Sequence, residues 1–134
     1  SDISKARLCA RFADRRVVEI IYMANKGDVQ QVEAITQRLD NRLVMLARLT
    51  SAVQVAEAPL PTFTPSEEAG SDKDVRVRAN NRANLRTTLA SYALSHPAGL
   101  RAALEKAPKS AKPALQRAID ISTAGYKRAL KALD

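Results

Sequence analysis

Apolar residues recur through residues 3–56 at the spacing of two long amphipathic helices. In the first run the steps alternate between three and four residues, at Ile3, Ala6, Ala10, Ala13, Val17, Ile20 and Ala24. The second run keeps this spacing with one gap, at Val32, Ile35, Leu39, Leu46, Leu49, Val53 and Ala56. A row of apolar residues at this spacing, here called a seam, faces one partner helix along its whole length. The pattern predicts helices over residues 3–25 and 29–56.

The connection between these two helices is very short. Gly27 suits the left-handed residue that ends a helix, and Asp28 suits the N-cap of the next one. A connection of this length makes the two helices antiparallel neighbours. We therefore predict an α-helical hairpin over residues 1–57.

Arg42 fills the gap in the second seam, and two interpretations of it stay open. In one, its side chain lies beside Ala10 and Ala13, and Asp14 accepts its hydrogen bonds. In the other, the helix is rotated slightly, Leu43 takes the core position and Arg42 extends to water. We favour the second interpretation.

The first helix also has apolar residues away from its seam. A helix in a simple two-helix coil needs only one apolar stripe. We therefore expect this helix to contact more than one neighbour, inside a bundle or across a dimer. The residues concerned are Leu8, Phe12, Val18 and Tyr22.

Residues 58–73 differ in composition from the helical segments around them. Prolines break any helix here, and Gly70 adds flexibility; the prolines are Pro59, Pro61 and Pro65. We predict a linker over these residues, with Phe63 docked on the helices as an anchor.

The third helix is predicted to begin near Ser71, which with Asp74 resembles a capping box. The segment Ser95-His96-Pro97 should interrupt it, because the residue before a proline avoids helical geometry. A short helix over residues 98–106 is expected to follow.

The fourth helix is predicted to begin with Ser110 as its N-cap and Pro113 in its first turn. Residues 74–134 then hold the C-terminal helices of the chain. Together with the hairpin, these elements define the expected fold class. It is all-α, a single-domain bundle of four main helices plus one short helix, built on an N-terminal antiparallel hairpin.

Composition agrees with this fold class. The chain has 134 residues, which suits one domain that buries a core without disulfides or metals. Hydrophobic residues make up 46% of it and aromatic residues only 4%, a mixture that favours close-packed helices with small residues at their contacts. A β-sandwich or barrel would need runs with a period of two, and the sequence has none.

The net charge of +8 indicates an anionic partner, such as nucleic acid, a membrane surface or an acidic polymer. The alternative is that the arginines pair with the chain's own carboxylates. No stretch approaches the roughly 18 apolar residues of a membrane span. Because the chain starts at Ser1 without a methionine, we expect membrane contact only through a segment outside these residues.

Candidate catalytic chemistry is sparse. Cys9 and His96 are the single cysteine and histidine, they belong to different predicted helices, and nothing in their spacing brings them together. We interpret Cys9 as a small buried side chain and His96 as part of the end of the third helix. The spacings of metal ligands and of a glycine-rich phosphate loop do not occur. We predict no enzymatic activity, no cofactor and no metal.

Basic residues at helical spacing are the stronger candidates for a binding site. Arginine forks match phosphate oxygens, so a row of them on one helix face could bind a polyanion. The alternative is solvated faces, partly neutralised by Asp14, Glu19 and Asp74. No aromatic residue alternates with these arginines, which disfavours stacking on single-stranded bases. The candidates are Arg7, Arg11, Arg15, Arg78, Arg82, Arg86, Lys106, Lys109 and Lys112.

Both ends of the chain resemble a bacterial family of uncharacterised helical domains. The resemblance lies in Lys5-Ala6-Arg7-Leu8, Ala13-Asp14-Arg15-Arg16-Val17 with Glu19-Ile20, Lys26-Gly27-Asp28, Ala107-Pro108, Ala111-Lys112-Pro113-Ala114-Leu115 and Gly125-Tyr126-Lys127-Arg128-Ala129-Leu130. The arginine-rich middle and the linker do not match. The resemblance implies a helical domain of a membrane-anchored or exported envelope protein, with no assigned enzyme activity.

Three functions of different classes follow as expectations. The first is a non-enzymatic interaction or sensory domain of a bacterial envelope protein, extracytoplasmic, whose partner is a protein or an anionic polymer. The second is a basic nucleic-acid-binding protein that uses the arginine rows and is cytoplasmic. A metal-binding or small-molecule-binding bundle is a third, because helical bundles often host such sites. A dimer through the apolar flanks of the first helix is compatible with each of them.

Overall fold

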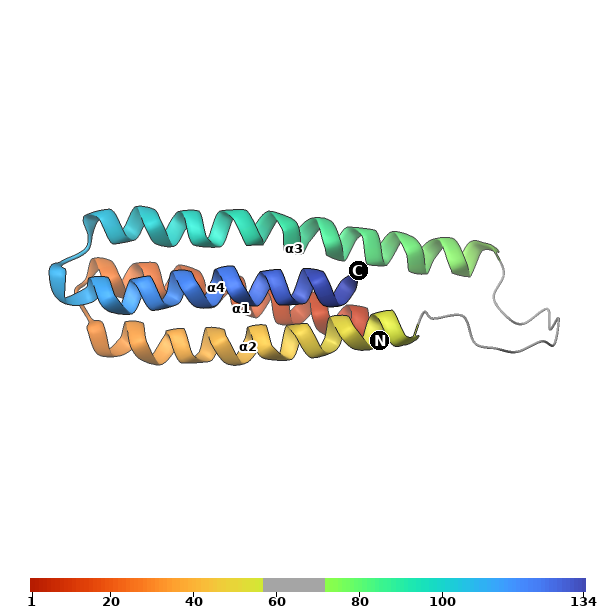
Figure 1. The fold of residues 1–134 in the computed structure, drawn as a ribbon, viewed down its shortest axis with the longest axis horizontal. Helices are drawn as coiled ribbons and strands as arrows, with labels where there is room; N and C mark the ends of the chain where they lie inside the picture. Colours follow the sequence, from red (N-terminus) through yellow and green to blue (C-terminus); the bar gives the residue numbers. More distant parts are fainter. Residues whose placement is uncertain (57–71) are drawn as a thin grey trace.

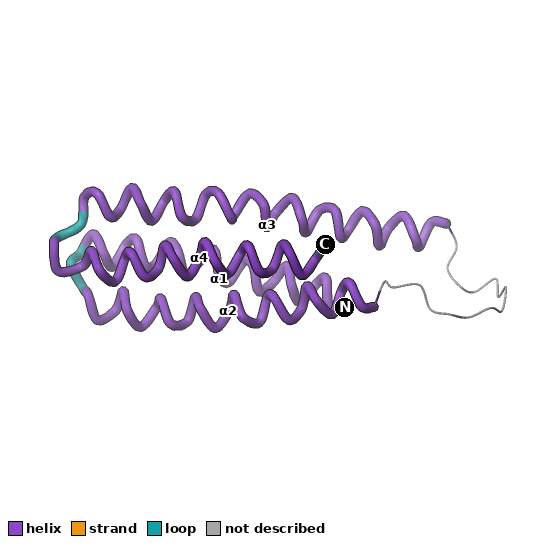
Figure 2. Tube along the Cα trace, in the orientation of Figure 1, coloured by secondary structure: helices purple, strands orange, loops and turns teal. Residues whose placement is uncertain are grey.

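Four α-helices form a bundle in the computed structural model, which describes residues 1–56 and 72–134 (Figure 1). The helices are α1 (Asp2–Asn25), α2 (Val29–Ala56), α3 (Asp72–Lys106) and α4 (Lys112–Leu133), and a short 3-10 helix, η1 (Lys109–Ala111), leads into α4. Every element of secondary structure in these two ranges is helical (Figure 2). The predicted fold class, an all-α bundle built on an N-terminal hairpin, is confirmed.

Each helix of the bundle packs against two others. Helix α1 contacts α2 and α3, and α4 likewise contacts α2 and α3, so α1 and α4 are diagonally opposite. Consecutive helices run in opposite directions, which makes α1 parallel to α3 and α2 parallel to α4 (Figure 1). Helix α1 therefore contacts two neighbours within a single chain, as expected. The reason given for that expectation is wrong in part, because Leu8, Val18 and Tyr22 are about half exposed.

The hairpin connection has the predicted geometry. Gly27 adopts a left-handed backbone with φ of 76°, which favours glycine. The Asp28 carboxylate accepts a hydrogen bond of 3.1 Å from the backbone N–H of Gln31, as an N-cap residue does. Both predictions rest on local chemistry, and both are confirmed.

The seam of α1 is buried almost completely, and its alanines let α2 approach closely. On α2, Leu43 is fully buried while Arg42 lies partly exposed over the ring of Phe12, at 4.6 Å from its centroid. The interpretation that rotates α2 and places Leu43 in the core is thus confirmed. The rotation also buries Thr36 and Thr50, whose hydroxyls donate to backbone carbonyls of their own helix.

The predicted break at Pro97 is wrong. Helix α3 continues through it, so residues 98–106 are part of α3 and the short helix of the fold is η1. A proline inside a helix removes one backbone hydrogen bond. Here the side chains of His96 and Pro97 are both buried, and their packing against neighbouring helices offsets that loss.

The boundaries around α3 and α4 also differ from expectation. Helix α3 begins at Asp72, so the predicted linker is two residues too long at its end. Ser110 lies inside η1, and the N-cap of α4 is Ala111, without a side-chain cap. Pro113 is in the first turn of α4 as predicted. Ser71 and Phe63, with the rest of residues 57–71, lie outside the described part of the chain.

Helices α2 and α4 make a close approach at Gly125. A Cβ atom placed on this glycine would lie 2.6 Å from Cδ1 and 2.8 Å from Cβ of Leu43. Carbon atoms in contact prefer separations of about 3.5–4.0 Å. Only a residue without a side chain fits at this crossing.

Candidate functional site

A line of polar side chains crosses the bundle from α1 through α3 to α4. His96 on α3 lies at its centre, with Nε2 at 2.7 Å from Oδ1 of Asp14 and Nδ1 at 2.7 Å from the Tyr126 hydroxyl. Tyr126 is fully buried and His96 nearly so, whereas about half of the Asp14 side chain reaches solvent. The cluster therefore links three helices through one imidazole.

The hydrogen bonds of His96 determine its tautomer. A carboxylate can only accept, so Nε2 carries a proton and donates it to Asp14. In the neutral ring Nδ1 is then an acceptor, and the Tyr126 hydroxyl donates to it. Tyr92, one turn earlier on α3, stacks on the imidazole with ring centroids 4.5 Å apart. All four side chains are held in a single arrangement.

Burial sets the acid–base properties of the cluster. Desolvation lowers the pKa of His96, and the hydrogen bond and charge of Asp14 oppose that change. Desolvation raises the pKa of Tyr126 well above its ordinary value, and the charge of Asp14 raises it further. The pKa of Tyr92 is raised for the same two reasons. The neutral forms of the histidine and both tyrosines are therefore favoured.

This arrangement resembles the base and orienting carboxylate of a hydrolytic triad, but its third member is unsuited to attack. Tyr126 is a protonated phenol with no exposed surface, so a substrate cannot reach its oxygen. Cys9 donates its own hydrogen bond of 3.0 Å to the backbone carbonyl of Arg42, and burial raises the pKa of its thiol. Cys9 and His96 thus have different hydrogen-bond partners.

The sequence interpretation missed this cluster. Its members come from positions 14, 96 and 126, and no local pattern connects them. His96 was expected to end a helix at Pro97, which hid its i,i+4 relation to Tyr92. Asp14 is interpreted from the sequence as a partner for Arg42 or as a carboxylate that neutralises the arginine rows, not as a partner for His96. The one available signal was that the single histidine lies in a helix with a tyrosine one turn away.

The arginine row of α1 lies on the face that points away from the other helices. Arg7, Arg11 and Arg15 are all exposed, and among the described residues none of them is in an ion pair. The same face carries three large apolar side chains that are about half exposed, Leu8 at 51%, Val18 at 60% and Tyr22 at 55%. We call Leu8, Arg11, Arg15, Val18 and Tyr22 the outer stripe of α1.

The arginine row of α3 has a different environment. Arg78 is exposed. The first part of α3 extends past the end of α4 (Figure 1). Arg82 donates a hydrogen bond of 2.7 Å to the carbonyl of Leu133, and Arg86 forms an ion pair of 2.8 Å with Asp134. Two of the three arginines therefore bind the C-terminal end of α4, where the helix dipole favours cations.

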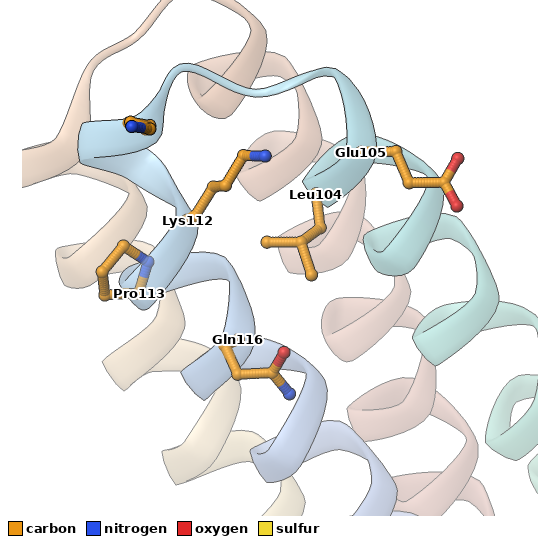
Figure 3. Close-up of a pocket in the computed structure, with 6 residues that line it drawn as sticks. Leu104, Glu105, Lys112, Pro113 and Gln116 are labelled. Carbon is orange, nitrogen blue, oxygen red and sulfur yellow. The ribbon is translucent and has the colours of Figure 1, made fainter.

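The three lysines lie around the turn between α3 and α4, and all are exposed. Lys109 and Lys112 line a shallow depression of about 550 Å³ beside Leu104 and Gln116. Figure 3 shows Lys112 extending across this depression, while the carboxylate of Glu105 points outward. Long, solvated side chains and one acidic neighbour make this a weakly organised surface.

Residues 1–56 and 72–134 contain neither a cluster of metal ligands nor a membrane-spanning helix. Within them no group of three or more potential metal ligands lies close enough to hold an ion. None of the helices they contain is long and apolar enough to cross a bilayer.

No family model, no curated protein and no solved structure matches this chain. The resemblance to a bacterial family of helical domains therefore stays a prediction from the residues that carry it. The fold and its surfaces define a basic four-helix bundle with one helix face that is both apolar and cationic.

Proposed function

We propose that this chain is a non-enzymatic interaction domain that binds a negatively charged partner through the outer face of α1. In keeping with the sequence resemblance, the proposal places it in a bacterial envelope protein. One observation carries the proposal. Three large apolar side chains stand half exposed among arginines that form no ion pair with any described residue, on a helix whose opposite face is buried almost completely.

The bundle itself does not explain this face. The packing of α1 against α2 and α3 uses the seam on the opposite side, which is already filled. Two acidic residues lie close to these arginines along the helix, and both have other partners. Asp14 is hydrogen-bonded to His96 at 2.7 Å, and Glu19 pairs with Arg16 at 3.3 Å. Exposed apolar surface next to cations is typical of a face that binds a partner. The face is thus available to a ligand of opposite charge.

The nucleic-acid alternative is less well supported. It requires both arginine rows, but Arg82 and Arg86 contact the end of α4. The outer stripe of α1 places apolar side chains where a phosphate backbone offers no apolar surface. Binding of duplex DNA with random sequence, weakened by removal of Arg78, would favour this alternative.

The test measures retention of the full chain on an immobilised anionic polymer, heparin, in a salt gradient. The variant carries R7A, R11A and R15A, and its matched control carries K127A, R128A and K131A, exposed cations on α4. Both lose three charges, so any difference reports the location of the charges. We expect the α1 variant to elute at clearly lower salt than the control. Equal elution would show that only net charge matters, and the proposal would fall.

A further inference from the structure

The outer stripe repeats at steps of three, four, three and four residues. That spacing is the same as in the buried seam of α1 and is the pattern with which one helix packs along another. We infer that the outer stripe binds one acidic, amphipathic helix of a partner protein, which lies along α1 as an additional helix of the bundle. This inference rests on the proposed function and specifies its partner.

The dimensions of the stripe suit a short helix. From Leu8 to Tyr22 it covers fourteen residue steps, which is about 21 Å of helix or two heptads. Leu8 lies near one end, Val18 and Tyr22 lie near the other, and all three retain about half of their surface for contact. A β-strand or an irregular segment would have no matching period along this face.

The charges of the stripe determine the chemistry of the partner. Arg11 and Arg15 lie between Leu8 and Val18, so any helix that covers the apolar residues also covers these cations. Covering an unpaired cation is unfavourable, and a carboxylate that forms a bidentate pair with the guanidinium compensates for it. Lys26, whose amine lies 4.6 Å from the ring centroid of Tyr22, adds a cation at the end of the stripe. The partner helix should therefore carry glutamate or aspartate opposite the arginines.

Two other occupants fit these charges poorly. A second copy of the chain, paired through the same face, would bring arginines together with arginines. A bilayer would have to accept Arg11 and Arg15 in the middle of the inserting face, whereas helices that lie on membranes keep their cations on the opposite face. An acidic helix is the occupant for which the apolar and the charged positions are both satisfied.

The test uses three fluorescent peptides of three heptads each, with binding to the full chain measured by anisotropy. The first has leucine and glutamate in the spacing of the stripe, the second has lysine in place of glutamate, and the third has the composition of the first in an order without helical period. We expect the first peptide to bind at least tenfold more tightly than the other two. A protein carrying R11E and R15E should reverse the preference between the first two peptides.

Apolar contact is tested by V18S, for which L94S is the matched control. Leu94 lies on α3 and is 77% exposed, so this change removes a similar side chain away from the stripe. We expect V18S to weaken binding of the first peptide about fivefold or more and L94S to leave it unchanged. Circular dichroism of each variant confirms that the bundle is intact.

The outcomes separate this inference from the proposed function. If the periodic and the permuted acidic peptides bind equally well, while heparin retention still depends on the α1 arginines, the partner is any polyanion and the inference is refuted alone. If retention on heparin does not depend on those arginines either, both proposals fail. Arginine-dependent sedimentation with phosphatidylglycerol vesicles, or a concentration-dependent dimer lost in V18S, would overturn the inference in favour of a membrane or a second copy.

Discussion

Replacement of Gly125 by alanine tests the packing of α2 against α4. In an exposed helix interior, alanine in place of glycine stabilises a protein by about 1 kcal/mol, because the backbone of the unfolded chain loses freedom. At this position the new methyl group would lie 2.6 Å from Cδ1 and 2.8 Å from Cβ of Leu43. A rotamer change can move Cδ1, but Cβ moves only with the backbone of α2.

The expected result is a net loss of stability. Overpacking of a filled core costs about 1–3 kcal/mol, and the gain in helix propensity offsets about 1 kcal/mol of that cost. Gly125→Ala should therefore lower the free energy of unfolding by up to about 2 kcal/mol. For a chain of this size the upper value corresponds to roughly 8 °C in the melting temperature.

Gly99 on α3 provides a matched control in the same bundle. A Cβ atom there would lie 3.4 Å from Cδ1 of Ile21, the flexible tip of a side chain that can move aside. Gly99→Ala should be neutral or stabilising by up to about 1 kcal/mol. Urea unfolding followed by far-UV circular dichroism compares the two variants with the unmodified chain. If Gly125→Ala is as stable as Gly99→Ala, the two helices do not cross at the distance described here.

Three further predictions concern the polar contacts. Tyr126→Phe leaves Nδ1 of His96 buried without a donor, so urea unfolding should show a loss of about 1–3 kcal/mol; an unchanged midpoint would contradict the hydrogen bond. Burial lowers the pKa of His96 in the folded chain below the usual 6.5 of the unfolded chain. Between these two pKa values the unfolded chain binds more protons than the folded chain. The free energy of unfolding should therefore be highest above pH 6.5 and should decrease as the pH falls from 6.5 to the pKa of the folded chain. His96→Gln should flatten that slope, as measured by unfolding at a series of pH values. Arg82 and Arg86 both donate to the carbonyl of Leu133, at 2.7 and 3.4 Å, and Arg86 also pairs with Asp134. Arg82→Ala removes the shorter hydrogen bond and should lower the free energy of unfolding by about 1 kcal/mol. Arg86→Ala removes the longer hydrogen bond and an exposed ion pair, so its cost should be smaller, and urea unfolding should show that this cost decreases at high salt.

The hairpin was predictable because its causes are local. The left-handed backbone at Gly27 and the N-cap at Asp28 depend on residues within one turn of the connection. The buried seam of α1 follows from a period that can be counted in the sequence. For α2 the same period left two rotations open, and only contact with Phe12 and with the neighbouring helices shows that Leu43 is inside.

The error at Pro97 has a different origin. The rule that a proline ends a helix describes the preference of an isolated chain, and here neighbouring helices bury both Pro97 and His96. The free energy from that packing is invisible in the local sequence. By predicting a break, the sequence interpretation also removed the turn that brings Tyr92 onto the imidazole of His96.

The candidate sites also have features that the sequence predicts and features that depend on tertiary packing. Periodicity alone located the arginines of α1 on one face, and the structure places them on the outside of the bundle. Periodicity could not show that Arg82 and Arg86 bind the end of α4, some fifty residues away in the chain. Periodicity also could not show that the apolar flank of α1 faces away from α2 and α3, since a flank is buried or exposed only through what packs beside it.

The sequence by itself determined the helices, the reversal at Gly27 and the face on which each regular row of residues lies, because these depend on backbone preferences and on the 3.6-residue period. Tertiary structure alone decided the ring order of the helices, the continuity of α3 through Pro97 and the meeting of Asp14, His96 and Tyr126. Those outcomes depend on contacts between residues far apart in the chain, whose free energy exceeds the local preferences.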